Sequence, residues 1–217
     1  MTFILNILHR EMSILAADRK AIAGSPVTVS PETSTVYDYK KITLHASRNL
    51  ALGTAGNTQD HYYAPTLYLN TSIDEVICKI RKHMEGFLQI HDRSGLSTLT
   101  SFMVNEGIVS FFDRDADSYF SYTFLFSPVC NQNRLYRAKD EVQIFTAGSG
   151  SKGYEKAIGK EDIDSFIAST KESSTPEACI LWIQDVYRKV SAYDVNSGPE
   201  AMFVVSTKSN PKFHERC

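Results

Sequence analysis

The chain has 217 residues, 42% of them hydrophobic, and a formal net charge of −2 with a pI of about 6.3. This length supplies one sizeable hydrophobic core and is short for two, so we expect a single domain over residues 1–217. The weakly acidic balance offers no basic surface for a phosphate backbone, and we expect no nucleic-acid partner.

The first quarter of the chain is predicted to consist of strands. Residues 3–8 and 13–17 are apolar segments of strand length, joined by a short turn into a hairpin. Residues 24–39 are rich in Ser, Thr and Pro and indicate either a long surface loop or an extended hairpin. Residues 41–46 and 49–54 indicate two further strands.

The later segments alternate between helical and strand patterns. A capping box at residues 72–75 opens an amphipathic helix, and the short β-rich runs of residues 100–145 indicate a second sheet. One helix is expected through residues 154–167, a second behind the Thr-Pro pair at 175–176, and a last strand at 201–206. This order predicts an α+β fold in which two antiparallel sheets pack face to face with helices outside.

Thr2 follows the initiator Met1 directly. Removal of that methionine would leave a residue that carries both a hydroxyl and a free α-amino group. Such an amino group has a pKa near ~7.7–8.0, so much of it can accept a proton from the hydroxyl or from water at neutral pH. The simpler interpretation is that Thr2 is a small residue at the start of a strand.

Five further strings stand in a fixed order behind this threonine. They are residues 14–20 with Asp18 after a small pair, 40–42 with Lys41, 52–60 with an Ala-Gly turn, 146–151 with a glycine-serine turn, and 193–198 with an Asp-x-x-Ser-Gly element. Their order and spacing resemble those of bacterial-type proteasome β subunits, which are N-terminal nucleophile (Ntn) hydrolases. The resemblance implies a four-layer αββα sandwich of two antiparallel sheets flanked by helices, and self-association into a ring or layered homo-oligomer.

The resemblance also assigns roles to individual residues. Thr2 would attack an amide carbonyl, Lys41 would stand beside its hydroxyl as a fixed positive charge, and Asp18 would hold that lysine inside the protein. Taken singly, a surface lysine and a surface aspartate are the ordinary interpretations of Lys41 and Asp18. The remaining assignments are Gly56 as an amide donor to the oxyanion, Ser149, Asp194 and Ser197 around the α-amino group, and Thr54 in the pocket for the substrate side chain.

Signals for cofactors and metals are weak by comparison. Residues 148–153 match G-x-G-x-x-G, but the segment about twenty residues on is polar and lacks the acidic residue that binds a ribose. Residues 113–117 open like a calcium loop without its glycine and glutamate, which favours a hairpin tip. We expect neither cofactor nor metal, because the histidines are dispersed and no Cys-x-x-Cys pair occurs among Cys78, Cys130, Cys179 and Cys217.

No run of residues approaches the roughly 18 apolar positions of a membrane span, and the start lacks the pattern of a signal peptide. With its scattered cysteines, the chain is therefore expected to be cytoplasmic. Two hypotheses follow for its function. The first is a threonine peptidase acting on peptides or unfolded protein, and the second is an inactive structural subunit of an assembly in which Met1 is retained. An unfoldase partner and the number of subunits stay open.

Overall fold

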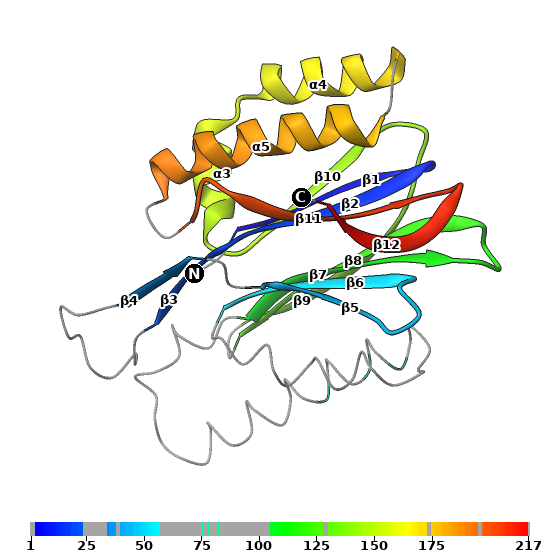
Figure 1. The fold of residues 1–217 in the computed structure, drawn as a ribbon, viewed down its shortest axis with the longest axis horizontal. Coiled ribbons are helices and arrows are strands. Elements are labelled where there is room, and N and C mark those ends of the chain that lie inside the picture. Colours follow the sequence, from blue (N-terminus) through cyan, green and yellow to red (C-terminus); the bar gives the residue numbers. More distant parts are fainter. Residues whose placement is uncertain are drawn as a thin grey trace.

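The protein is represented by a computed structural model that describes residues 3–23, 34–37, 40–56, 75, 78, 82, 105–127, 130–172, 175–194 and 197–216. Within these residues the chain forms two five-stranded antiparallel sheets, a two-stranded ribbon and three long helices (Figure 1). The predicted α+β class with two antiparallel sheets is confirmed. Among the described helices, none is long and apolar enough to span a membrane.

Sheet 1 contains both ends of the described chain. Two of its three interior strands are buried along their whole length, because helices cover one face and the second sheet covers the other. The predicted hairpin of residues 3–8 and 13–17 is confirmed as the β1–β2 pair. In spatial order the strands are β10 (Gln143–Ala147), β1 (Ile4–His9), β2 (Met12–Asp18), β11 (Ala201–Thr207) and β12 (Asn210–Arg216).

Sheet 2 is a meander in which each strand pairs with the next one along the chain. The predicted hairpin tip at residues 113–117 is confirmed, since the amides of Asp115 and Ala116 donate to Asp113 Oδ1 and Asp117 has a φ of 43°. The strands are β5 (Ile42–Leu44), β6 (Leu50–Gly56), β7 (Asn105–Asp113), β8 (Ser118–Ser127) and β9 (Cys130–Arg137).

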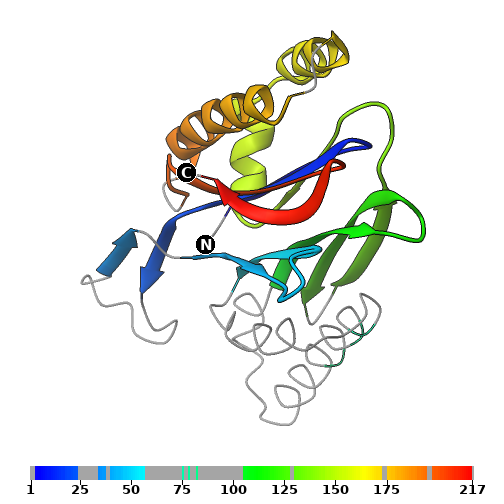
Figure 2. The same ribbon diagram turned by 45° about the vertical axis from the view of Figure 1, so that its right-hand side comes forward.

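Three helices lie on the outer side of sheet 1, two of them against the sheet and one beyond these (Figures 1 and 2). They are α3 (Gly150–Ala157), α4 (Lys160–Glu172) and α5 (Pro176–Tyr193). Helix α5 begins as predicted, with Pro176 in its first turn and the Thr175 hydroxyl accepting from the Ala178 amide at 3.3 Å. Helix α5 packs directly on β2 and β11, and α4 packs on α5.

The alternation of strand side chains divides the core in two. On β1 and β2, Leu5 and Ile14 face the helices, where they join the side chains of α5. Ile4 and Leu15 point the other way, into the layer between the sheets. The described residues thus form a helix layer and two sheet layers. The predicted helix opened at residues 72–75 lies outside the described residues apart from single positions, and with it the fourth layer of the expected sandwich.

Three expectations were wrong in detail. The helix expected through residues 154–167 is two helices, because Ile158 is extended and the Asp162 carboxylate accepts from the Gly159 amide at 3.0 Å, which starts α4 anew. The β-rich run of residues 100–145 is split, since β10 leaves sheet 2 and pairs with β1. Strand β11 is followed by β12, a polar edge strand that buries Phe213 and lacks an apolar pattern.

The segment between β2 and β5 contains a hairpin. Strand β3 (Lys20–Ala23) pairs with β4 (Ser34–Tyr37) as a separate two-stranded ribbon. Of the two alternatives for residues 24–39, the extended hairpin therefore describes the part of the segment that the structure covers. The ribbon directs the chain back to Lys41, just before β5.

Candidate active site

Asp18 and Lys41 form a buried ion pair between the two sheets. Asp18 is the last residue of β2 and Lys41 directly precedes β5, so the pair joins sheet 1 to sheet 2. The Lys41 Nζ lies 2.9 Å from Asp18 Oδ2, and the two side chains are 3% and 0% exposed. Lys41 also donates to the carbonyl of Lys20. The structure thus brings together the cation and counter-charge that the sequence suggested.

The Asp18 carboxylate makes two further hydrogen bonds, both from backbone amides. Its Oδ1 accepts from the Phe3 amide at 2.7 Å, and its Oδ2 accepts from the Gly198 amide at 3.2 Å. A buried carboxylate is stable only when its oxygens are paired in this way. Asp18 therefore ties the start of β1, the lysine before β5 and the loop before β11 to one point.

Both the carbonyl and the ring of Phe3, the residue after Thr2, contact neighbouring residues. Its carbonyl accepts from the Asp18 amide at 3.1 Å and from the Tyr187 hydroxyl at 3.0 Å. Its ring lies 4.9 Å from the ring of Tyr187 and 6.0 Å from that of Tyr154. Thr2 and Met1 lie outside the described residues, and the contacts above fix the position of Phe3 itself.

Tyr187 was not identified from the sequence. It lies on the buried stripe of α5, one turn after Ile183, where a tyrosine cannot be distinguished from ordinary core. Burial raises the pKa of its phenol well above the usual value, and the charge of Asp18 adds to the shift. The hydroxyl is therefore a permanent donor to Phe3 at physiological pH. The signal that the sequence offered was chemical, because the hydroxyl of a tyrosine on a buried helix face needs a hydrogen-bond acceptor.

A second polar cluster gathers at the N-terminus of α3 and the C-terminus of α5. Asp194 Oδ2 accepts from the Ser197 hydroxyl at 2.7 Å and from the Ser149 hydroxyl at 3.4 Å. Gly148, before Ser149, has a φ of 91°, a conformation that favours glycine. Ser197 is adjacent to Gly198, which donates to Asp18. The three residues expected around the α-amino group are thus in contact, next to the ion pair.

Thr54 and Gly56 both lie on β6. The Thr54 amide donates to the Lys41 carbonyl at 3.4 Å, and its side chain is 7% exposed. A Cβ on Gly53 would meet Ile4 of sheet 1, so alternation places Thr54 on the opposite face of sheet 2. Gly56 is the last residue of β6 and pairs with Asn105. The roles expected of Thr54 and Gly56 stay predictions.

The glycines of the G-x-G-x-x-G string serve packing. A Cβ on Gly150 would stand 2.4 Å from the Cβ of Phe3, and one on Gly153 would stand 3.2 Å from Val190 Cγ1. Sheet 1 is antiparallel throughout, so the string lacks the parallel strands of a dinucleotide fold. In the described part of the chain no three His, Cys, Asp or Glu side chains gather as metal ligands.

No protein-family model and no curated protein matches this chain. Its function must therefore be inferred from its own residues and their geometry.

Proposed function

We propose that the chain is an N-terminal threonine amide hydrolase with the fold of the proteasome β-type Ntn hydrolases, acting on peptides or unfolded protein. The observation that carries the proposal is the buried Asp18–Lys41 pair, hydrogen-bonded through Asp18 Oδ1 to the amide that follows Thr2. A buried ion pair is often no more stable than apolar residues of the same volume, so stability alone gives little reason for one. A fixed cation beside a chain start is instead typical of a site that activates a nucleophile.

In the first half of the reaction, the Thr2 α-amino group takes the hydroxyl proton while Oγ bonds to the carbonyl carbon of the substrate. The carbonyl oxygen becomes an oxyanion, to which the Gly56 amide donates. Collapse of this intermediate breaks the carbon–nitrogen bond, and the proton held by the amino group passes to the leaving amine. The first part of the substrate remains as an ester on Thr2.

In the second half, water attacks that ester with the same amino group as base, which releases the acid and restores the threonine hydroxyl. The positive charge of Lys41 lowers the cost of deprotonating the hydroxyl. Ser149, Asp194 and Ser197 orient the amino group. Thr54 is assigned to the contact with the substrate side chain.

The layer order supports this fold for the described residues. Helices, sheet 1 and sheet 2 follow one another as in three of the four layers of an Ntn sandwich, and the helix predicted from residues 72–75 would supply the fourth. A homo-oligomeric ring or layered assembly in the cytoplasm belongs to the same proposal. The competing hypothesis is an inactive assembly subunit, in which retained Met1 turns the Thr2 nitrogen into an amide without basicity.

Intact mass and peptide hydrolysis together test the proposal. We expect purified protein to have lost one methionine and to hydrolyse members of a fluorogenic peptide library. Thr2→Ala should abolish hydrolysis, whereas Thr2→Ser, which keeps a hydroxyl on the same atom, should retain a measurable rate. Protein that begins at Thr2 and cleaves no peptide would refute the proposal, and quantitative retention of Met1 would favour the structural subunit.

A further inference from the structure

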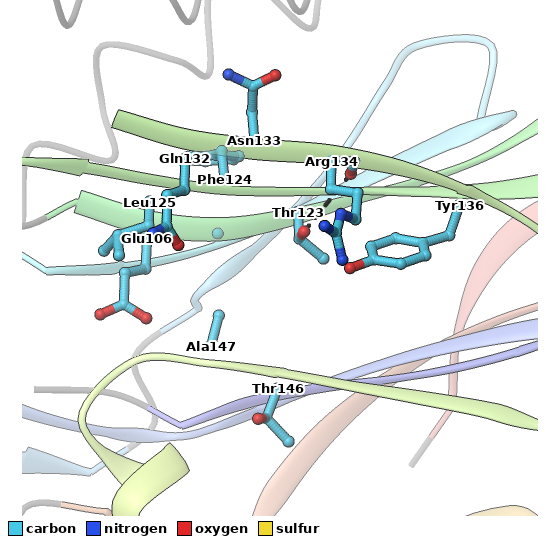
Figure 3. A pocket seen from close by; sticks show the side chains of 11 residues that line it. Glu106, Thr123, Phe124, Leu125, Gln132, Asn133, Arg134, Tyr136, Thr146 and Ala147 are labelled. Atoms are coloured by element: carbon cyan, nitrogen blue, oxygen red, sulfur yellow. Dashed lines mark hydrogen bonds between the residues drawn. The ribbon is translucent and has the colours of Figure 1, made fainter. Parts of the chain in front are cut away.

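A cleft of about 700 Å³ opens between the two sheets on the side of β9 and β10. This volume is within the roughly 300–1,000 Å³ range of ligand pockets. Figure 3 shows Glu106, Arg134 and Tyr136 pointing from sheet 2 toward Ala147 at the end of β10. The cleft wall on sheet 2 is therefore polar and charged, although it lies between two otherwise apolar sheet faces.

The inner end of this cleft adjoins the candidate active site. Ala147, which lines it, pairs with Ile4 of β1, two residues after Thr2. The next residue, Gly148, donates its amide to Glu106 Oε2 at 2.7 Å and precedes Ser149. Glu106 consequently lies at the end of the cleft beside the turn whose serine binds Asp194.

Arg134 supplies the opposite charge farther along the cleft. Its guanidinium carbon lies 5.9 Å from the ring centre of Tyr136, and within the described ranges no acidic side chain pairs with it. Glu106 is in register with Leu125 of β8, and Leu125 with Gln132 of β9, two residues before Arg134. Strand spacing then puts the Cα atoms of Glu106 and Arg134 roughly 12 Å apart.

Opposite charges carried by two side chains whose Cα atoms are this far apart, both directed into the cleft (Figure 3), are compatible with the two ends of a short peptide. Cleavage of an amide gives the leaving segment a new amino group, which carries a proton at neutral pH, while the far end of that segment carries the chain's carboxylate if it is the C-terminus. Three extended residues span about 10 Å. Arginine is well suited to the carboxylate, because its donors bind both oxygens at once.

We propose that the cleft binds the segment on the C-terminal side of the cleaved bond, as a peptide of about three residues with a free carboxylate. The proposal rests on the function inferred above and narrows its substrates to chains cut close to their C-terminus. Glu106 receives the new ammonium group at the site, and Arg134 receives the carboxylate near the cleft mouth. Neither role was identified from the sequence.

The kinetic test uses two peptides that differ only in their C-terminal group. Both carry three residues after the cleaved bond, and one ends in a carboxylate, the other in an amide. We expect about tenfold higher kcat/KM for the carboxylate, the effect of one charge-assisted hydrogen-bonded pair. Arg134→Gln should remove this preference. Arg137→Gln, on the opposite face of β9, should keep it, since Arg137 lies over Phe120 and donates to Ala116.

A binding test separates this proposal from the proposed function. Trialanine and trialaninamide are titrated into the Thr2→Ala protein, with amide resonances followed by NMR. We expect trialanine to bind at least fivefold more tightly than its amide, and Arg134→Gln to make the two equal. Equal affinity of the two peptides for the Thr2→Ala protein with Arg134 intact, or no binding at millimolar peptide, would overturn the cleft assignment. Carboxylate-dependent binding to the Thr2→Ala protein, combined with no peptide hydrolysis by protein that begins at an intact Thr2, would instead support the cleft and refute the peptidase.

Discussion

At the scale of single residues, Asp18 has the greatest effect on the architecture of the site. Its two carboxylate oxygens serve Phe3, Gly198 and Lys41, which come from three distant parts of the chain. A glutamate would place these oxygens one methylene farther out, and an asparagine would remove the charge that Lys41 needs. The same side chain thus supports the fold and, in the proposed mechanism, the chemistry.

Asp18→Asn should be strongly destabilising, because it leaves the Lys41 ammonium buried without its counter-charge. We expect a loss of about 3–5 kcal/mol in the free energy of unfolding, measured by denaturant titration. Asp140→Asn is the matched control, since it breaks an exposed pair with Arg10 and should cost less than about 1 kcal/mol. Similar losses in the two variants would contradict a buried charge pair at Asp18.

The double variant Asp18→Asn, Lys41→Met separates stability from catalysis. Methionine fills the space of the lysine stem without a charge, so much of the lost stability should return. We expect no peptide hydrolysis, because the cation that the proposed mechanism needs is gone. Recovered hydrolysis in this variant would show that Lys41 has no catalytic role.

Tyr187→Phe tests how firmly the residue after Thr2 must be held. Removing the hydroxyl leaves the Phe3 carbonyl with one donor fewer, which should cost about 1 kcal/mol of stability. If the hydrogen bond from Tyr187 to Phe3 positions the proposed nucleophile, kcat should fall several-fold at unchanged KM. Tyr193→Phe on the same helix, where the side chain is 62% exposed, should change neither quantity.

The sequence identified the polar residues of the candidate site far better than the residues that support them. The strings that contain them can be recognised, and the structure brings Asp18 into contact with Lys41, and Ser149 and Ser197 into contact with Asp194. Tyr187 belongs to no string, because its function depends on a carbonyl 184 residues away in the chain. Contacts between residues so far apart in the chain depend on how the elements pack, which cannot be inferred from a single sequence.

At the scale of elements, the first residue of α3 must be a glycine because the helix start lies very close to Phe3. Gly150 faces the Phe3 side chain so closely that an added Cβ would fall 2.4 Å from the Phe3 Cβ. Helix propensity alone would favour alanine over glycine there by about 1 kcal/mol. The steric conflict is the larger effect, because neither the strand nor the helix start can move freely.

Gly150→Ala should therefore lower stability by about 1–3 kcal/mol, the usual cost of overpacking. It should also reduce hydrolysis by displacing Phe3. Gly159→Ala is the control, because the nearest atom to its added Cβ is the flexible Asp162 carboxylate at 3.5 Å. Equal melting temperatures for Gly150→Ala and the parent protein would contradict the contact between α3 and β1.

Strands with a continuous apolar run were predicted correctly, whereas a break set by one side-chain cap inside a helical pattern and a polar edge strand were not. Strands β1, β2 and β11 are apolar on both faces and are evident from the sequence. The break between α3 and α4 depends on one side-chain cap at Asp162, inside a pattern that is otherwise helical. Strand β12 is a polar edge strand held by its pairing with β11.

At the scale of the whole molecule, burial of several weak acids makes stability dependent on pH. Burial raises the pKa of Tyr119, Tyr154 and Cys179 to about 12 each. In the unfolded chain these groups ionise near their ordinary pKa values of 10.0, 10.0 and 9.0. Their contribution to stability is therefore fully present below about pH 9 and is lost as the pH rises toward 12.

We expect the free energy of unfolding to be lower at pH 10.5 than at pH 8 by a few kcal/mol, since each unit of pKa shift corresponds to about 1.4 kcal/mol. Urea titrations at the two pH values measure this difference. Cys179→Ala should reduce the part of the loss that begins near pH 9. Equal stability at the two pH values would contradict the burial of these groups.

The central claim is that Thr2 presents a hydroxyl and a free amine beside Lys41. The most direct measurement is peptide mapping by mass spectrometry after reaction with a peptide epoxyketone, which closes a ring with the hydroxyl and amine of one residue. We predict a single adduct on Thr2, absent from Thr2→Ala and strongly slowed in Lys41→Met. An unmodified Thr2 in protein that has lost Met1, or an adduct elsewhere, would contradict the account.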